Sequence, residues 1–195
     1  MLSHIQMSER KLQLNLSAGQ SIPKNLAWHI DDGYLMALSS TDEVENLVLG
    51  IWGTGELVIP KLIKAERFKL VTLSPVLVEE CEATLLDELE FQQNMIGQLA
   101  ELLELLRIRP AEYRLLLLLL WLGGRFGRVN SQGTSLSTSM MKLTHNNLAM
   151  LTGMTRVTIT RLLGKYKKHG FIIEQGDDYL IHNGAAAALR GFENF

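Results

Sequence analysis

Hydrophobic residues occur in short runs over the first eighty residues of the chain, and turn-forming residues interrupt each run. Short apolar runs separated by glycine or proline are typical of β-strands. The runs are LQLNL, YLMALSS, NLVLGIW, ELVI and FKLVTL, and the breaks fall at Gly19, Asp32-Gly33, Gly53, Gly55 and Pro60. Several short strands at this spacing predict a small β-roll from about residue 12 to residue 80.

The pattern changes between residues 82 and 107, where apolar residues recur at helical spacing without a proline and with only one glycine. The stripe contains Leu85, Leu89, Met95, Leu99, Leu102 and Leu106, and Ile96 and Leu103 widen it. A repeat near seven residues is typical of a helix that pairs with a second helix. We therefore expect a dimerisation helix over residues 82–109, with Met95, Leu99, Leu102 and Leu106 in the dimer interface. The alternative is a helix that packs only within its own chain.

A hinge is predicted at residues 109–111, because Pro110 fixes φ and suits the first position of a helix. The following helix is expected from residue 112 to about residue 126. Its buried side is predicted to contain Tyr113, Leu116, Leu117, Leu120 and Trp121. A polar loop over residues 127–139 then leads into a strand near residues 136–143. The chain closes with a hairpin, since the apolar runs FII and YLI flank a Gly-Asp-Asp turn at residues 176–178.

Residues 143–171 contain two short helices, each with a chemical start signal. Thr144 can cap the first helix by accepting from the amides of its first turn, and Thr155 can cap the second. Between them Gly153 permits a positive φ. Leu148, Ala149 and Leu151 form the inward face of the first helix. This arrangement predicts a helix-turn-helix, and the hairpin that follows it would be the wing of a winged helix.

The second of these helices, from about residue 156 to residue 169, is basic and fits a DNA major groove. Arg156 can offer a two-pronged hydrogen bond to guanine, and Arg161 lies within reach of a base edge or a phosphate. We expect base reading by Arg156, Val157, Thr158 and Arg161, and backbone contacts from Lys142, Thr144, His145, Thr155, Thr160, Lys165 and Lys167. The alternative is a structural helical hairpin whose Arg and Lys side chains are simply solvated.

The ten residues TRVTITRLLG, at positions 155–164, resemble the recognition helix of the Crp/Fnr family of bacterial regulators, especially the cyanobacterial nitrogen-control activators. The resemblance covers residues 81–182. It implies a homodimeric transcription regulator that binds double-stranded DNA, with RNA polymerase as a further partner. In the broad family a Glu follows the first recognition-helix Arg, but here Val157 stands there and can pack on a thymine methyl group instead. The nitrogen-control subgroup suggests half-sites that read GTA and, inverted, TAC.

The first eighty residues match that family poorly. The segment GIWGTGELV resembles the turn that closes the family's roll, but the hairpin that normally separates the glycines at positions 19 and 33 is shortened. An Arg-Ser-Ala-like phosphate segment is missing, and Val58, Ile59 and Pro60 follow where a helical phosphate cradle would start. No Lys or Arg occurs between Cys81 and Arg107. We therefore predict an α+β protein with a truncated β-roll over residues 1–81, without a cyclic-nucleotide site, and a winged helix-turn-helix over residues 110–195.

The net charge differs in sign between the two ends of the chain, which indicates that they have separate functions. Residues 1–110 hold nine Lys and Arg against sixteen Asp and Glu, a net charge of −7, whereas residues 111–195 hold ten against five, a net charge of +5. Neutralising DNA phosphates requires such a concentration of positive charge. The acidic end keeps the rest of the molecule from binding nucleic acid nonspecifically.

Other chemistries have little support in the sequence. The single cysteine excludes an intrachain disulfide and supplies too few thiolates for an iron–sulfur cluster or a structural zinc. The five histidines are scattered and belong to no catalytic or metal-binding motif. No export signal is apparent, and the apolar run at residues 115–124 is too short to span a bilayer. We expect a cytoplasmic protein with no enzymatic activity, no metal, no cofactor and no membrane partner.

Two further interpretations stay open at this stage. The chain could be a protein-interaction module or a small-molecule sensor with a vestigial DNA-binding domain, or a constitutive DNA binder that needs no effector. The sequence identifies neither an effector nor the sign of regulation.

Overall fold

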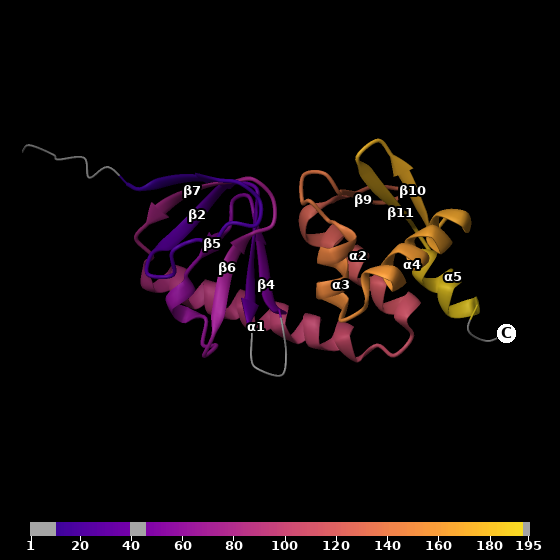
Figure 1. The fold of residues 1–195 in the computed structure, drawn as a ribbon, viewed down its shortest axis with the longest axis horizontal. Coiled ribbons are helices and arrows are strands. Elements are labelled where there is room, and N and C mark those ends of the chain that lie inside the picture. Colours follow the sequence, from indigo (N-terminus) through magenta and orange to yellow (C-terminus); the bar gives the residue numbers. More distant parts are fainter. Residues whose placement is uncertain (1–10, 40–45, 193–195) are drawn as a thin grey trace, which may run out of the picture.

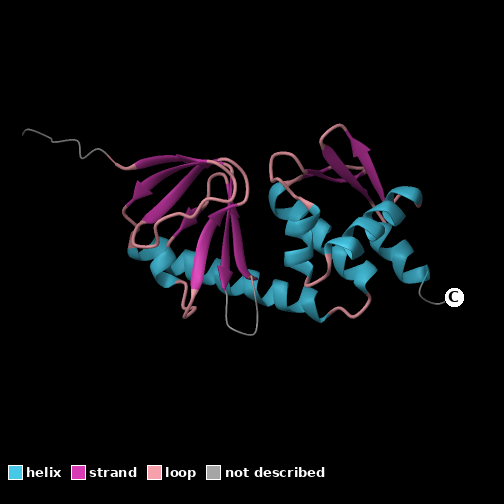
Figure 2. Ribbon diagram, in the orientation of Figure 1, coloured by secondary structure: helices cyan, strands magenta, loops and turns pink. Residues whose placement is uncertain are grey.

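A computed structural model describes residues 11–39 and 46–192, and it consists of two parts joined by one long helix (Figure 1). Strands gather in the N-terminal part and helices in the C-terminal part (Figure 2). Helix α1 (Leu85–Arg107) runs along the β-rich part and reaches the helical part at its C-terminal end. Among the described residues, no helix combines the length and hydropathy needed to span a bilayer.

The N-terminal part is a roll of two antiparallel sheets. One sheet has the order β1-β7-β2-β5, formed by β1 (Gln13–Leu16), β7 (Val76–Cys81), β2 (Ala27–Asp32) and β5 (Leu57–Val58). The other has the order β4-β3-β6, formed by β4 (Leu47–Gly53), β3 (Tyr34–Ser39) and β6 (Phe68–Thr72). The short 3₁₀ helix η1 (Pro60–Leu62) follows β5. Inward-facing residues of both sheets, such as Trp28, Leu35 and Val78, form one buried core.

Five of the seven strands correspond to the predicted apolar runs, but β2 and β7 were not predicted. In β2, buried Trp28 and Ile30 alternate with the exposed polar residues His29 and Asp31. Such alternation is typical of a strand with one buried face. Because polar residues interrupt the apolar ones, a search for continuous apolar runs does not detect this strand.

Helix α1 begins with a reciprocal cap. The Asp87 amide donates to Thr84 Oγ1 at 3.2 Å, and the Thr84 amide donates to Asp87 Oδ2 at 2.8 Å. Hydrogen bonds from Thr84 lower the pKa of the Asp87 carboxyl group. Further along, Phe91 stacks on Trp52 of β4 with ring centroids 5.7 Å apart, and Gln98 Oε1 accepts from the Ile51 amide at 3.0 Å. The helix is therefore packed firmly against its own roll.

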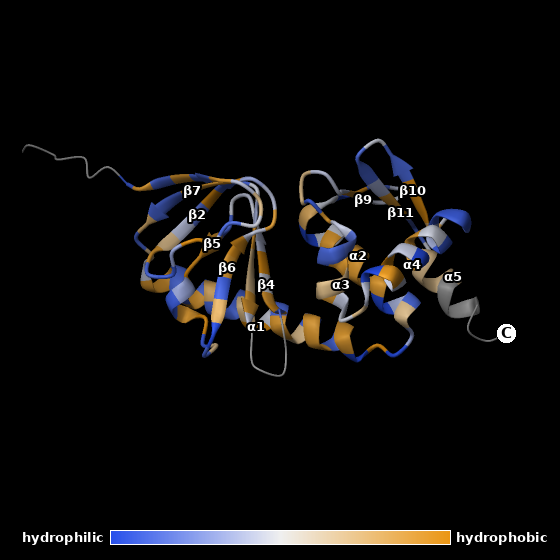
Figure 3. Cartoon of the chain, in the orientation of Figure 1, coloured by the Kyte–Doolittle hydropathy of each residue, from blue (hydrophilic) through white to orange (hydrophobic). Residues whose placement is uncertain are grey.

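This packing buries part of the apolar stripe of α1 and leaves another part exposed. Met95 and Leu102 are only 8% and 4% exposed because they belong to the cores of their own chain, and Leu99 and Leu106 are half-buried. In contrast, Ile96 and Leu103 are 68% and 62% exposed. Apolar and polar residues alternate along α1 in Figure 3. The stripe predicted from the sequence is thus wide enough to face two neighbours. Met95 packs in the core of the roll and also lines a surface hollow beside Ile96, and Leu102 packs in the cluster that includes the winged helix. The assignment of Met95, Leu99, Leu102 and Leu106 to a dimer seam stays a prediction.

The C-terminal part is a winged helix. It comprises α2 (Ala111–Phe126), β8 (Arg128–Val129), β9 (Gly133–Ser137), α3 (His145–Thr152), α4 (Arg156–Lys168), β10 (Ile172–Gln175), β11 (Asp178–His182) and α5 (Ala185–Phe192). The sheet has the order β10-β11-β9-β8, and β10 and β11 form the predicted hairpin. Buried Tyr166 donates its hydroxyl to the Glu112 carbonyl, and burial raises the pKa of Tyr166.

Three details of this part differ from the sequence-based expectation. Of the five residues predicted to be buried in α2, only Leu116 is fully buried, whereas the helix actually buries Leu115, Leu116, Leu118, Leu119 and Leu122. The run of six consecutive leucines carries no periodic signal, so its inner side could not be identified. The predicted strand at residues 136–143 lies earlier, as β9, and helix α5 was not predicted.

The two parts contact each other directly. Arg125 Nη2 of α2 lies 2.8 Å from Glu56 Oε1, next to β5, and the rings of Tyr34 and Phe126 meet edge to face at 5.4 Å. Met36 and Ile51 of the roll share one buried cluster with the leucines of α2. The winged helix is therefore held against the roll by both apolar and charged contacts.

Candidate nucleic-acid interface

The helix-turn-helix forms as its sequence signals predict. Thr144 Oγ1 accepts from the Asn147 amide at 3.1 Å at the start of α3, and Thr155 Oγ1 accepts from the Thr158 amide at 3.2 Å at the start of α4. Gly153 ends α3 with φ +65°, in the left-handed region that favours glycine. Both predicted caps and the predicted turn are confirmed.

Helix α4 has one buried side and one free side. Ile159, Leu162, Leu163 and Tyr166 are fully buried and attach the helix to the domain core. The outer side presents Val157, Thr160, Arg161, Gly164 and Lys168, all of them exposed. Val157 is 78% exposed, although its side chain is apolar. An exposed apolar side chain within a basic helix suits contact with a thymine methyl group.

Of the four predicted base-reading residues, three lie exposed on α4: Arg156, Val157 and Arg161. Within the part of the chain that the structure describes, neither arginine forms an ion pair, so both guanidinium groups are available to a ligand. Thr158 is half-buried, and its hydroxyl lies 2.9 Å from Thr155 Oγ1. Thr158 thus takes part in the cap at the start of α4 and is less exposed than the three other predicted base-reading residues.

Several predicted backbone contacts lie at the start of α3 and in the first two turns of α4. His145 Nδ1 lies 2.8 Å from Thr160 Oγ1, which joins α3 to α4, and the Thr160 hydroxyl also donates to the Arg156 carbonyl at 3.0 Å. Thr144 and Thr155 are the two helix caps described above. Lys142 is exposed in the turn before α3 and has φ +46°. Lys142 and Thr144 thus stand at the start of α3, and Thr155 at the start of α4, and the free amides of a helix start favour an anion.

The two predicted lysines of α4 have partners within the chain. Lys165 Nζ lies 2.9 Å from Glu112 Oε2, and Lys167 Nζ lies 2.5 Å from Glu174 Oε1. Lys168, by contrast, is exposed on the same side as Arg161 and forms no ion pair with a described residue. Lys168 lies seven residues after Arg161, and the helical repeat therefore places both on one side of α4. The sequence did not single out Lys168, because the buried side of α4 has to be known first.

Comparisons with known proteins place this geometry in a family. The model of the Crp-like helix-turn-helix domain matches residues 113–186, which contain α3, α4 and the wing. Regulatory protein CysR of Synechococcus elongatus is 34% identical to the chain over 148 residues, covering 76% of this chain and 72% of that protein. The chain belongs to the Crp/Fnr family of transcription regulators. Its basic helix-turn-helix is therefore a DNA-binding element of a known type.

Solved structures of the Crp/Fnr family share the whole fold. A transcriptional regulator of this family from Thermus thermophilus superposes with a TM-score of 0.66 at 18% identity, covering 94% of this chain and 99% of that chain. FixK2 from Bradyrhizobium japonicum gives a TM-score of 0.72 at 11% identity, covering 93% and 96%. The predicted fold class, a β-roll followed by a long helix and a winged helix-turn-helix, is confirmed.

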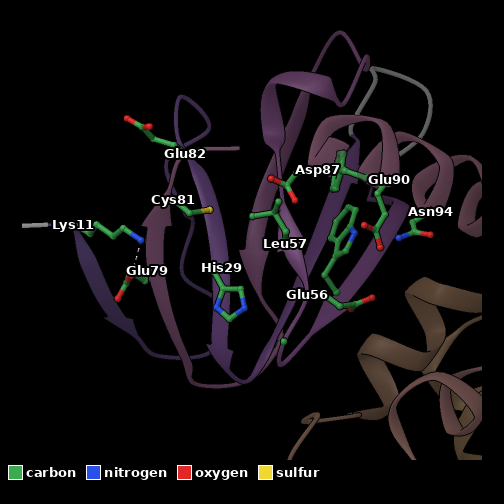
Figure 4. Close-up of a pocket in the computed structure, with 13 residues that line it drawn as sticks. Lys11, His29, Glu56, Leu57, Glu79, Cys81, Glu82, Asp87, Glu90 and Asn94 are labelled. Atoms are coloured by element: carbon green, nitrogen blue, oxygen red, sulfur yellow. Dashed lines mark ion pairs between the residues drawn. The ribbon is translucent and has the colours of Figure 1, made fainter. Parts of the chain in front are cut away.

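This Crp/Fnr chain also has a cavity of about 610 Å³ between the first sheet of the roll and the N-terminal half of α1 (Figure 4). Five carboxylates line it, from Glu56, Glu79, Glu82, Asp87 and Glu90. Lys11 also lines it but is paired with Glu79, Nζ to Oε1 at 3.3 Å. Within the described residues, no three His, Cys, Asp or Glu side chains are placed to hold a metal ion together. The cavity is thus acidic, with its carboxylates spread over its walls.

Proposed function

We propose that this Crp/Fnr-family chain acts as a homodimer that binds a two-fold symmetric operator through one α4 helix per subunit. The observation that carries this proposal is the outer side of α4, where Arg156 and Arg161 form no ion pair with a described residue and lie beside exposed Val157. A dimer that sets two such helices one DNA turn apart would bind adjacent major grooves.

The parts of the chain take separate roles in this proposal. We assign residues 1–81 to a shortened sensor roll, residues 82–109 to dimerisation and residues 110–195 to DNA binding. A regulator of this kind acts on DNA in the cytoplasm and needs no enzymatic activity. RNA polymerase as a further partner stays a prediction.

Base identity would come from a few side chains. Arg156 and Arg161 can each donate two hydrogen bonds to guanine, and Val157 can contact a thymine methyl group. Half-sites reading GTA and, inverted, TAC suit this set. Lys142, His145 and Lys168 would contact phosphates. Lys165 and Lys167 could join them by exchanging a surface carboxylate for a phosphate, since such surface ion pairs contribute only about 0–1 kcal/mol.

The dimer seam would use the side of α1 that faces away from the roll. Leu89, Ile96 and Leu103 are exposed there at intervals of seven residues, the repeat of a paired helix. Beside them lies an apolar hollow of about 420 Å³ whose lining includes Leu62, Ile63 and Leu99. A second copy of α1 would cover this surface, with Leu99 and Leu106 at the edge of the seam.

The cavity of the roll supports the proposed absence of a cyclic-nucleotide site. A phosphate entering it would meet an acidic surface that includes Glu82 and Glu90, neither of which forms an ion pair with a described residue, and like charges at close range oppose binding. Where a phosphate cradle would begin, the chain forms only the three-residue helix η1, which starts with a proline and so lacks one amide donor.

A titration of the purified chain tests the proposed function. The probe is a fluorescent duplex with inverted GTA and TAC half-sites, and a scrambled duplex of the same length is the control. Specific sites bind roughly 10³–10⁷ times more tightly than nonspecific DNA at physiological salt. We expect selective binding that weakens steeply as salt rises, because bound phosphates release counterions. Equal affinity for both duplexes at every salt concentration would contradict the proposal.

A second candidate function is a sensor that responds to a small organic cation. The acidic cavity favours it, because Glu82 and Glu90 line the cavity without an ion pair to any described residue. Trp52, which is 2% exposed, also lines the cavity, and its Nε1 has no hydrogen-bond partner among the described residues. A ligand with an ammonium or guanidinium group and an acceptor atom would satisfy both features. Because Glu56 lines the cavity and also binds Arg125, such a ligand would compete with the winged helix for one carboxylate.

Calorimetry with L-argininamide, a cation that carries a carbonyl acceptor, tests this second function, and cyclic AMP serves as the anionic comparison. We expect argininamide to bind and cyclic AMP not to bind. Glu90→Gln should weaken argininamide binding roughly two- to fivefold, the value of one exposed charge pair. Glu104→Gln, at an exposed position of α1 outside the cavity, is the matched control. Tighter binding of cyclic AMP than of argininamide would contradict both the cationic ligand and the absence of a nucleotide site.

A further inference from the structure

Arg114, in the first turn of α2, joins the ends of two other helices. Its Nε donates to the Ile108 carbonyl at 2.8 Å, and its Nη1 donates to the Thr152 carbonyl at 2.9 Å. Ile108 is the C-cap residue that follows α1, and Thr152 is the last residue of α3. One half-buried side chain therefore connects the long helix, the first helix of the winged domain and the helix-turn-helix.

The chemistry of helix ends explains why an arginine stands at this position. The last carbonyls of a helix have no partner within the helix and carry the negative end of its dipole. A guanidinium group has several donors in a fixed plane, so two of them can bind two separate carbonyls at once. A lysine offers one compact ammonium group at the same place.

Apolar contacts surround this connection. Leu102 of α1 and Leu151 of α3 belong to the same buried cluster. At the turn between α3 and α4, a methyl group added to Gly153 would lie 3.9 Å from Leu106 Cδ2, which is ordinary contact distance. The last turns of α1 therefore lie next to the segment from which α4 starts.

We propose that Arg114 is a positioning residue that fixes the orientation of α4 relative to α1, and thereby the distance between the two α4 helices of a dimer. This inference rests on the proposed dimeric operator binding. If α1 forms the two-fold seam, a rigid connection from its end to the helix-turn-helix sets the half-site spacing that the dimer accepts. Loss of the connection leaves each α4 able to bind DNA but lets its position vary.

The experiment measures how strongly the dimer prefers one half-site spacing. Three duplexes carry the inverted GTA and TAC half-sites at the best spacing found for the unmodified chain and at one base pair more and one fewer, and a scrambled duplex is included. Arg114→Met loses both charge-assisted hydrogen bonds, so we expect the preference for the best spacing to fall by about tenfold or more. Arg114→Lys should give an intermediate value. Binding to scrambled DNA should stay unchanged.

Arg109→Met is the matched control, because Arg109 is an exposed hinge residue that loses the same charge without a contact to either carbonyl. All measurements are made well below the melting temperature of each variant. If Arg114→Met lowers the melting temperature but keeps the full spacing preference, Arg114 is only a structural residue and the inference is overturned. If the unmodified chain itself has no spacing preference, the proposed dimeric binding fails, and this inference fails with it.

Discussion

A variant that carries both Ile96→Asp and Leu103→Asp is expected to be monomeric and to bind the symmetric operator roughly 10²–10⁴ times more weakly than the unmodified chain. Both residues are exposed on α1 and spaced by seven, so a two-fold axis along this helix would bring each near its own copy. Aspartates in such an apolar seam would be buried next to like charges. Without the seam, the second half-site has to be bound in a separate bimolecular event.

Sedimentation analysis together with operator titration measures this effect. Asn94→Asp is the control for an added negative charge, because it places one new carboxylate at an exposed position on the cavity side of α1. That control should remain dimeric. Leu102→Ala offers a contrast, since a buried leucine costs about 2–5 kcal/mol of folding stability when it is truncated and would lower the melting temperature. A double aspartate variant that still dimerises would place the seam elsewhere.

Arg156→Ala is expected to lose about 1–3 kcal/mol of binding free energy on the operator, roughly a five- to 150-fold loss of affinity. Arg156 is exposed at the first turn of α4 and pairs with no described acidic residue, so its replacement removes nothing that the fold requires. A bidentate contact to guanine is specific to one base pair. The loss should therefore be confined largely to the specific duplex.

Titrations of the operator and the scrambled duplex at several salt concentrations separate base reading from phosphate contact. Lys168→Ala, on the same side of α4, should weaken binding to both duplexes alike. It should also lower the slope of log affinity against log salt concentration by about one, as expected for the loss of one phosphate contact. If Arg156→Ala binds the operator normally, or if both duplexes are affected equally, Arg156 does not read a base.

The sequence by itself determined the features whose causes are local. Thr144, Gly153 and Thr155 place the caps and the turn of the helix-turn-helix within a few residues, because helix termini depend on nearby amides and on the φ of one residue. The same holds for the wing hairpin, whose turn lies between two apolar runs. The family resemblance of residues 155–164 rests on a contiguous segment and needed no tertiary information.

Only the tertiary structure decided which side of each helix meets which neighbour. The stripe of α1 predicts burial but cannot distinguish the chain's own core from a second copy, and only the structure shows that Met95 and Leu102 pack within their own chain. The leucine run of α2 has no periodicity from which its inner side could be found. The connection made by Arg114 joins residues 38 positions apart, from Arg114 to Thr152, and depends on how three helices pack. Local propensity sets where elements begin and end, whereas long-range packing sets which surfaces remain free to bind DNA or a second subunit.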